Sequence, residues 1–159
     1  MNDVVQPNRP CVARISHIAL MTPNLARLTS FYVDVFGGVV VSSTGNPPWK
    51  CTLQLAPGTV LHLYEVPAES ARRHDDLPFD VGSINHFALE AQGPEDFLGI
   101  RERLIVGGYT DASVMAAPYG YSLNVLDPDG LYLEVTLEQP PGWEPPFRTT
   151  AFRPLPTPR

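Results

Sequence analysis

Apolar and polar positions first alternate along this chain and then recur at helical spacing. Residues 14–21 alternate and predict a strand. An apolar stripe at helical spacing follows Thr22-Pro23, where threonine can cap a helix and proline suits its first turn. Gly37-Gly38 ends this helix, because glycine adopts the left-handed C-terminal conformation without strain. Three short β runs then follow, near 39–44, 50–56 and 59–66.

The same order returns in the second half, roughly 70 residues later, as expected of a tandem repeat. Ile15-Ser16-His17-Ile18-Ala19-Leu20 is answered by Ile84-Asn85-His86-Phe87-Ala88-Leu89. Asp127-Pro128-Asp129-Gly130 gives a strong turn signal between the last two strands. The predicted elements are a strand at 83–91, a helix at 94–106 closed by Gly107-Gly108, and strands near 109–114, 119–126 and 131–138.

Each half is therefore a βαβββ unit, and one such unit cannot bury both faces of its sheet alone. The predicted fold is α+β, with two tandem βαβββ modules whose curved mixed sheets surround a shared cavity. The predicted boundaries are an N-terminal arm at 1–12, module one at 13–66, a connecting loop at 67–82, module two at 83–138 and a Pro-rich C-terminal tail at 139–159. Since proline lacks a backbone N–H, the tail is expected not to continue a sheet but to wrap the body or a partner subunit, or to be disordered.

Composition narrows the class of partner. A net charge of −6 and a pI near 5.1 disfavour nucleic acid and anionic membranes, since phosphate repels such a surface. The N-terminus has no apolar core of a signal peptide, and no apolar run is long enough to span a bilayer. Cys11 and Cys51 do not make a disulfide framework. These features predict a reduced, cytoplasmic protein with free thiols.

The repeat also aligns residues that bind metals. His17 matches His86, and His62 matches Glu134. Residues two apart in a strand share a face, so all four side chains converge if these faces line the cavity. Three imidazoles and a carboxylate suit one divalent first-row metal, with Fe(II) or Mn(II) favoured for O₂ chemistry and Zn(II) or Ni(II) for isomerisation.

A single histidine in a strand is more often a hydrogen-bonded structural residue than a ligand. Four metal-type residues at matching positions of a repeat favour a metal site. His62 has two interpretations, since it can be a fourth ligand or a proton carrier beside the metal. Glu134 is a ligand in either case, and in an isomerase it would also act as the base.

Aromatic and amide side chains near these strands are candidates for substrate binding. Trp49 and Tyr64 can stack on an aromatic substrate, although core or interface packing is the commoner role. Tyr119 and Asn124 precede the Asp-Pro-Asp-Gly turn. Either can face the cavity or the outer surface of the sheet.

At these residues the chain resembles the vicinal oxygen chelate superfamily, which includes glyoxalase I, fosfomycin-resistance thiol transferases, bleomycin-binding proteins and extradiol dioxygenases. The resemblance covers about residues 13–138. It rests on His17, on Phe31-Tyr32 through Phe36-Gly37, on His86, and on Asp127-Pro128-Asp129-Gly130 followed by Leu133-Glu134. It implies paired βαβββ modules, a divalent metal, a substrate that chelates the metal through adjacent oxygens, and a homodimer whose modules pair within or between chains.

Departures from the sequence patterns of individual family members help to distinguish between the activities that the resemblance implies. Glyoxalase I has glutamate at the position of His62. Extradiol dioxygenases use the triad matched by His17, His86 and Glu134 with a further histidine as acid–base catalyst, but they hold four modules and an active-site tyrosine where this chain reads Leu123-Asn124-Val125. Fosfomycin thiol transferases need a cationic pocket, and no cationic cluster lies in the strands.

The sequence therefore favours a metal-dependent dioxygenase acting on a small substrate with adjacent oxygens. The first alternative is a glyoxalase-like lyase, isomerase or epimerase acting through a metal-stabilised enediolate. The second is a non-catalytic drug- or metabolite-binding resistance protein. The retained ligand set argues against the second, because a binding cavity needs no metal.

Overall fold

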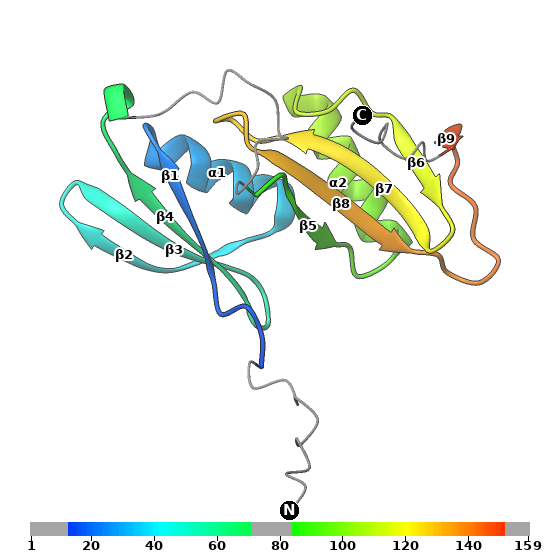
Figure 1. The fold of residues 1–159 in the computed structure, drawn as a ribbon, viewed down its shortest axis with the longest axis horizontal. Helices are drawn as coiled ribbons and strands as arrows, with labels where there is room; N and C mark the ends of the chain where they lie inside the picture. Colours follow the sequence, from blue (N-terminus) through cyan, green and yellow to red (C-terminus); the bar gives the residue numbers. More distant parts are fainter. Residues whose placement is uncertain (1–12, 71–83, 152–159) are drawn as a thin grey trace, which may run out of the picture.

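The computed structural model describes residues 13–70 and 84–151 of the chain. Within them the chain forms two modules that lie side by side (Figure 1). Each module begins with a strand and a helix and continues with three strands, and this confirms the predicted α+β fold of two βαβββ modules. The predicted N-terminal arm, most of the connecting loop and the end of the tail lie outside the described residues.

Module one is built around one helix and four strands. Its helix begins one residue after Asn24, whose side-chain oxygen accepts the backbone N–H of Arg27. The predicted cap, Thr22, is wrong: it is a buried residue whose hydroxyl oxygen accepts the backbone N–H of Asn24. Gly37 ends the helix at φ 71°, as predicted. The elements are β1 (Ile18–Thr22), α1 (Leu25–Phe36), β2 (Val39–Gly45), β3 (Pro48–Ala56) and β4 (Thr59–Glu65), followed by a short 3-10 turn at Ala68–Ser70.

Module two repeats this order with one addition. Its helix starts at Pro94, and Gly108 ends it at φ 73°. A strand expected near 109–114 lies instead at 114–117, because Ala112 has a φ of 67° that an extended strand cannot accommodate. The elements are β5 (Phe87–Glu90), α2 (Pro94–Gly107), β6 (Val114–Ala117), β7 (Gly120–Leu126), β8 (Tyr132–Glu138) and β9 (Thr149–Ala151).

Both sheets are mixed, as expected. The first has the strand order β1-β4-β3-β2 and the second β5-β8-β7-β6-β9. In each module the first strand pairs in parallel with the last strand of its βαβββ unit, and the remaining pairs of that unit are antiparallel. This arrangement puts the start of β1 beside β4, and the start of β5 beside β8.

The proline-rich segment contributes a strand after all. Thr149–Ala151 pairs in parallel with β6 at the edge of the second sheet. The expectation that this segment cannot continue a sheet is therefore wrong for these three residues. They contain no proline, so their backbone N–H groups are available for the ladder.

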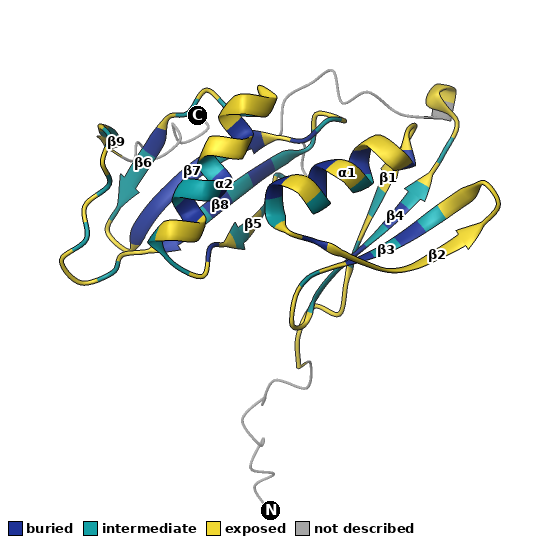
Figure 2. Ribbon diagram, turned by 180° about the vertical axis from the view of Figure 1, so that it is seen from behind, coloured by how far each residue is buried: buried dark blue, intermediate teal, exposed yellow. Residues whose placement is uncertain are grey.

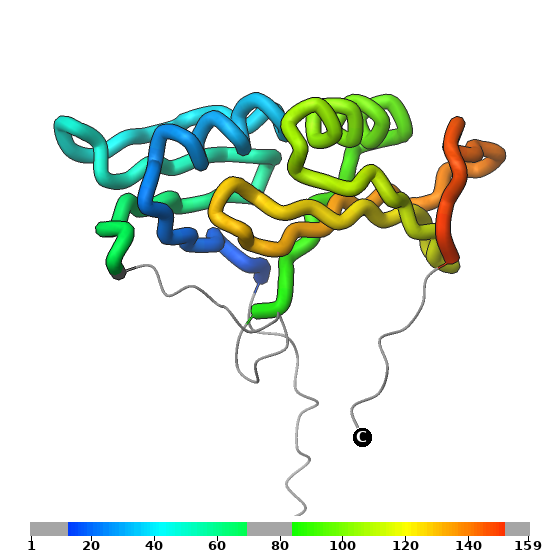
Figure 3. The backbone as a smooth tube through the Cα atoms, turned by 90° about the horizontal axis from the view of Figure 1, so that it is seen from above, coloured from blue at the N-terminus to red at the C-terminus, as the bar shows by residue number. Residues whose placement is uncertain are grey.

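Each helix covers one face of its own sheet, and the two helices lie side by side along one side of the molecule (Figure 3). The buried residues form one hydrophobic cluster that runs through both modules. Across the junction the rings of Phe31 and Tyr109 meet edge to face at 4.7 Å, and Arg103 Nε donates to the carbonyl of Val35 at 2.8 Å. The modules thus pack through their helices, and the opposite faces of the sheets stay open.

No helix within the described residues is long and apolar enough to cross a membrane. Cys51 is a free, buried cysteine in β3, and Cys11 lies outside the described residues.

Candidate metal centre

The first sheet brings together two of the four predicted ligands. His62 lies in the middle of β4, whose Leu61 and Leu63 are fully buried on the opposite face. Because neighbouring residues of a strand alternate between faces, His62 lies on the open face. His17 comes just before β1, and its ring stacks on that of His62 with centroids 4.3 Å apart and an angle of 22°. The repeat therefore places two imidazoles against each other on one sheet.

The second sheet brings together the other two. His86 comes just before β5, and Glu134 lies within β8. His86 Nε2 is 3.2 Å from Glu134 Oε2. The two side chains are partly exposed, so both can contact a ligand or ion from the open face. The expectation that all four ligands lie within strands is wrong for His17 and His86, each of which immediately precedes its strand.

Each of these two histidines has a partner at its other ring nitrogen. The Nδ1 atom of His86 is 2.5 Å from the side-chain oxygen of Asn85, and the Nδ1 atom of His17 is 3.0 Å from the hydroxyl of Ser16. A hydrogen bond at Nδ1 restrains the orientation of each ring, and the Nε2 atom of His86, beside Glu134, is the nitrogen that this arrangement leaves for a metal.

A hydrogen bond from the neighbouring strand β7 restrains the carboxylate of Glu134. The hydroxyl of Ser122, a buried residue of β7, donates to Glu134 Oε1. Asn124 is the direct cross-strand partner of Glu134 in the same sheet. One carboxylate oxygen of Glu134 is thus engaged by Ser122, while the other lies beside His86.

The surroundings of His62 favour its neutral form. Its pKa lies below the ordinary value of 6.5, first because desolvation disfavours the charged ring and then because Lys50 and His17 oppose a positive charge there. A neutral imidazole carries a lone pair at physiological pH. That lone pair suits either ligation or proton abstraction.

The donor set fits a divalent first-row metal, because imidazole nitrogens and a carboxylate are the ligands such ions take. The structure gathers these donors as two pairs, His17 with His62 and His86 with Glu134. Within residues 13–70 and 84–151, no three His, Cys, Asp or Glu side chains come close enough to hold one ion. The four predicted ligands therefore do not converge on one point within the described residues. The reason is that the modules pack through their helices, which keeps the open faces of the two sheets apart.

Two of the predicted substrate-binding residues adjoin the first pair. The rings of Trp49 and Tyr64 are 6.2 Å apart, and the Tyr64 ring is 6.4 Å from that of His62. Asn124 lies beside the second pair. Tyr119 does not: it is 67% exposed in the turn before β7, at the far end of that strand from Asn124.

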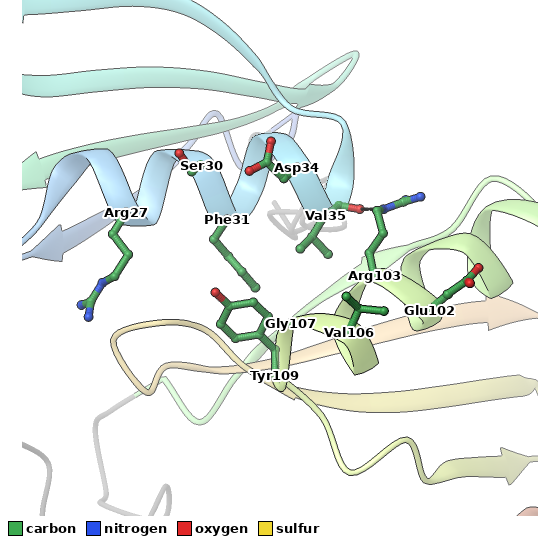
Figure 4. A pocket seen from close by; sticks show the side chains of 10 residues that line it. All are labelled: Arg27, Ser30, Phe31, Asp34, Val35, Glu102, Arg103, Val106, Gly107 and Tyr109. Carbon is green, nitrogen blue, oxygen red and sulfur yellow. Dashed lines mark hydrogen bonds between the residues drawn. The ribbon is translucent and has the colours of Figure 1, made fainter.

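The groove between the helices lies apart from these residues. It has a volume of about 550 Å³ and runs between α1 and α2, with Phe31, Arg103 and Tyr109 among its walls (Figure 4). None of the predicted site residues lines it. The chemistry predicted from the repeat belongs to the open faces of the sheets.

Comparison with known proteins decides the family. The chain matches the Glyoxalase/Bleomycin resistance protein/Dioxygenase superfamily over residues 14–135. The chain belongs to this superfamily. The match spans both modules and confirms the resemblance to the vicinal oxygen chelate proteins.

Solved structures of the superfamily share the fold. A glyoxalase/dioxygenase from Nostoc punctiforme aligns at a TM-score of 0.65 and 18% identity, covering 88% of this chain and 99% of the other. A domain from Frankia sp. EAN1pec named for the superfamily aligns at 0.63 and 20%, covering 80% and 99%. A lactoylglutathione lyase from Agrobacterium tumefaciens aligns at 0.58 and 25%, covering 80% and 96%. No curated protein matches the chain.

Sequence reasoning about this superfamily member missed three residues around the two pairs. Asn85 and Ser122 support His86 and Glu134, yet neither belongs to a recognisable motif. Lys50 stands above the ring of Tyr64, with its ammonium 5.1 Å from the ring centre. A signal for Lys50 was present, because it is the only lysine in the chain.

Proposed function

We propose that this chain is a metal-dependent dioxygenase of the vicinal oxygen chelate type. The observation that supports this most strongly is the donor set: two histidines and one carboxylate, His17, His86 and Glu134, accompanied by a further histidine. Two histidines and one carboxylate with open positions are the ligands of non-haem Fe(II) oxygenases. A bound divalent ion would polarise two adjacent oxygens of a substrate and lower the pKa of its hydroxyl groups.

Each residue of the two pairs has a separate task in this proposal. His17, His86 and Glu134 hold the metal. Ser122 and Asn85 orient Glu134 and His86, since groups that bond a ligand's free atoms fix its position. His62, neutral because of its lowered pKa, takes the proton from a substrate hydroxyl.

We further propose that the site closes between two copies of the chain. Each chain presents one pair on each sheet, so the first pair of one copy and the second pair of another make a full set. A two-fold dimer would then contain two such sites, because each subunit contributes the same two surfaces. Exposed apolar residues of module one, among them Met21 at 59% and Val39 at 60%, would lose their exposure in such a dimer.

The glyoxalase-like alternative has one observation in its favour. The lactoylglutathione lyase from Agrobacterium tumefaciens shares 25% identity with this chain and the same fold. Against it stands His62, since glyoxalase I is expected to have glutamate there. A lyase or isomerase would need Glu134 as its base, and the hydrogen bond from Ser122 restrains that carboxylate.

Oxygen uptake separates these activities. The protein loaded with Fe(II) should consume O₂ when given a substrate with adjacent ring hydroxyls, such as catechol. Loading with Zn(II) should give no uptake, because this ion does no redox chemistry. Turnover of a hemithioacetal by the Zn(II) or Ni(II) form, without oxygen uptake on any catechol, would contradict the dioxygenase assignment in favour of the glyoxalase-like one.

Sedimentation tests the dimer independently of activity. Equilibrium ultracentrifugation should give twice the 17.5 kDa of one chain. A monomer that nevertheless binds one metal ion tightly would contradict closure between chains.

A further inference from the structure

A cluster of three side chains on module one carries an inference about the substrate. Trp49, Lys50 and Tyr64 lie at the end of the first sheet, next to the stacked histidines. The indole and phenol rings are 6.2 Å apart and inclined by 33°, and the Lys50 ammonium stands 5.1 Å from the centre of the Tyr64 ring. Aromatic faces and a cation are thus presented together, beside the proposed base.

Trp49 is positioned even though it is 51% exposed. Its indole rests on Gly45, where an added Cβ would lie 2.5 Å from the indole Cδ1 and 2.9 Å from the carbonyl oxygen of Pro47. Gly45 also has a φ of 94°, a conformation that other residues rarely adopt. The orientation of the Trp49 ring is therefore restrained before a ligand binds. This reduces the conformational entropy that the side chain loses when a planar ligand packs against it.

The positive charge of Lys50 has no acidic partner among the residues that the structure describes. The residue is half-buried, and no carboxylate within the described residues lies within 4.0 Å of its ammonium. Its cross-strand partners are Tyr64 in β4 and Thr44 in β2, both neutral. An ammonium that stands beside the Tyr64 ring and has no described acidic partner is available to pair with an anionic group of a ligand.

The register places this position at a defined separation from the proposed base. Lys50 pairs with Tyr64, and Thr52 pairs with His62, one two-residue step along the same strands. Such a step measures about 7 Å. A single aromatic ring can span that separation, with its reacting oxygens near His62 and an anionic group near Lys50.

We propose that the substrate is an aromatic carboxylate with adjacent ring hydroxyls, whose ring lies against Trp49 and Tyr64 and whose carboxylate pairs with Lys50. The assignment of the reacting end rests on the proposed function. The subsite itself does not, because it consists of residues outside the metal ligands. Lys50 is accordingly a specificity-determining residue and takes no part in the chemistry.

Binding of benzoate to the metal-free protein tests the subsite without any turnover. The chain has two tryptophans, so a Trp143→Phe background leaves Trp49 as the only indole. Benzoate at pH 7.5 should quench its fluorescence saturably. Lys50→Met should raise the dissociation constant of benzoate by roughly tenfold or more, the usual contribution of a hydrogen bond to a charged group. Lys50→Arg should keep most of the wild-type affinity. Arg148→Met, which removes an exposed cation from module two, should leave it unchanged.

Chemical labelling gives a second readout. Because Lys50 is the only lysine, an amine-reactive acetylating reagent modifies one internal site, which peptide mass spectrometry can follow. Benzoate should protect Lys50, and benzyl alcohol, which has the ring without the charge, should protect it less. Equal quenching in Lys50→Met and its parent, or no protection by benzoate, would overturn the subsite.

Steady-state kinetics then link the subsite to the reaction. The ratio of kcat/KM for 3,4-dihydroxybenzoate to that for catechol should fall about tenfold in Lys50→Met, mainly through KM. Benzoate binding without turnover of any compound with adjacent hydroxyls would refute the dioxygenase and leave the subsite standing. Turnover of catechol with an unchanged ratio in Lys50→Met would refute the subsite and leave the dioxygenase standing.

Discussion

The two modules have the same order of elements but bury their strands to very different extents. All seven residues of β2 are exposed, including Val39, Val40 and Val41. In module two the counterpart of β2 is β6, which has no exposed residue, and the neighbouring β7 buries five of its seven residues. Figure 2 shows this contrast, with β2 exposed along its length and β7 largely buried.

The difference comes from the segment that follows β8. Trp143 packs its ring edge to face on Tyr121 at 5.2 Å, and the Arg101 guanidinium stands 4.1 Å from the centre of the Phe147 ring. β9 then pairs with β6 at the sheet edge. Module one has no described equivalent of this segment, so its edge strand β2 is paired on one side only.

This contrast shows that a sequence repeat sets the elements, whereas the segments outside it decide which surfaces are closed. An uncovered edge with exposed valines is a surface that proteins usually protect. In module one the uncovered face also carries His17, His62 and the cluster around Trp49. We therefore interpret this edge and open face of the first sheet as the surface that meets the substrate and a second copy of the chain.

The largest effect is expected at the second pair. Glu134→Ala should lower metal content below about a tenth of the wild-type value, because it removes the only carboxylate of the proposed ligand set. Ser122→Ala should weaken metal binding by about 10–100-fold, the range for a group that positions a ligand. Metal analysis after dialysis measures both, with Glu138→Ala on the same strand as control. Full metal content in Glu134→Ala would refute the ligand assignment.

At the first pair the loss should appear in turnover. His62→Ala should keep most of the metal but lower kcat by about 10²–10⁴-fold, the usual worth of a positioned acid–base group. Metal content and oxygen uptake are measured on the same sample. An emptied metal site would show that His62 is a ligand, and unchanged values of both would show that it serves neither role.

The two tryptophans test the contrast in burial. Trp143→Ala should lower the free energy of unfolding by about 1–3 kcal/mol, because it uncovers Tyr121. Trp49→Ala should change it by about 0.5 kcal/mol or less, since half of that ring is already exposed. Urea unfolding followed by circular dichroism compares them. Equal decreases in the free energy of unfolding would mean that the packing of Trp143 on Tyr121 stabilises the fold no more than an exposed side chain does.

A smaller effect is expected at Asp127, where module two meets α1. Burial raises the pKa of its carboxyl above the ordinary value of 3.8, while backbone N–H groups of Leu131 and Asp129 oppose this shift. The folded state therefore binds this proton more tightly than the unfolded state, so this group's contribution to stability falls as pH rises through the folded pKa.

Asp127→Asn should remove that pH dependence, because asparagine keeps an oxygen for the two N–H groups but carries no charge. The expected change in the free energy of unfolding near pH 7 is about 1 kcal/mol or less. Unfolding curves from pH 3.5 to 7 measure it. If the difference between variant and wild type is constant over that range, Asp127 does not titrate as described.

Much of the fold follows from local patterns. Both βαβββ units, the glycine helix ends and the mixed sheets could be predicted, since these depend on periodicity and on glycine. The start of α1 was missed because Asn24 and Thr22 are both good caps, and the choice depends on Thr22 being buried. β6 was misplaced because the hydroxyl of Thr110 bonds the carbonyl of Asn124 and holds residues 110–112 out of the ladder.

The candidate site is less completely predictable. Residue types and repeat positions predict His17, His62, His86 and Glu134 as donors, and the structure places them in two pairs. Neither the pairing nor the partners Ser122 and Asn85 follow from spacing, because they depend on cross-strand register and on how the helices pack. The metal ligation itself stays a prediction.

Mixing two inactive variants tests the central claim, that one chain's first pair joins another chain's second pair. One variant carries His17→Ala and His62→Ala, and the other His86→Ala and Glu134→Ala. Each alone should bind no metal at the site. After unfolding and refolding together in equal amounts, about a quarter of wild-type sites should return, because half of randomly assorted dimers are heterodimers and each contains one intact site. No recovery of metal or turnover, in a mixture shown to contain heterodimers, would contradict the claim.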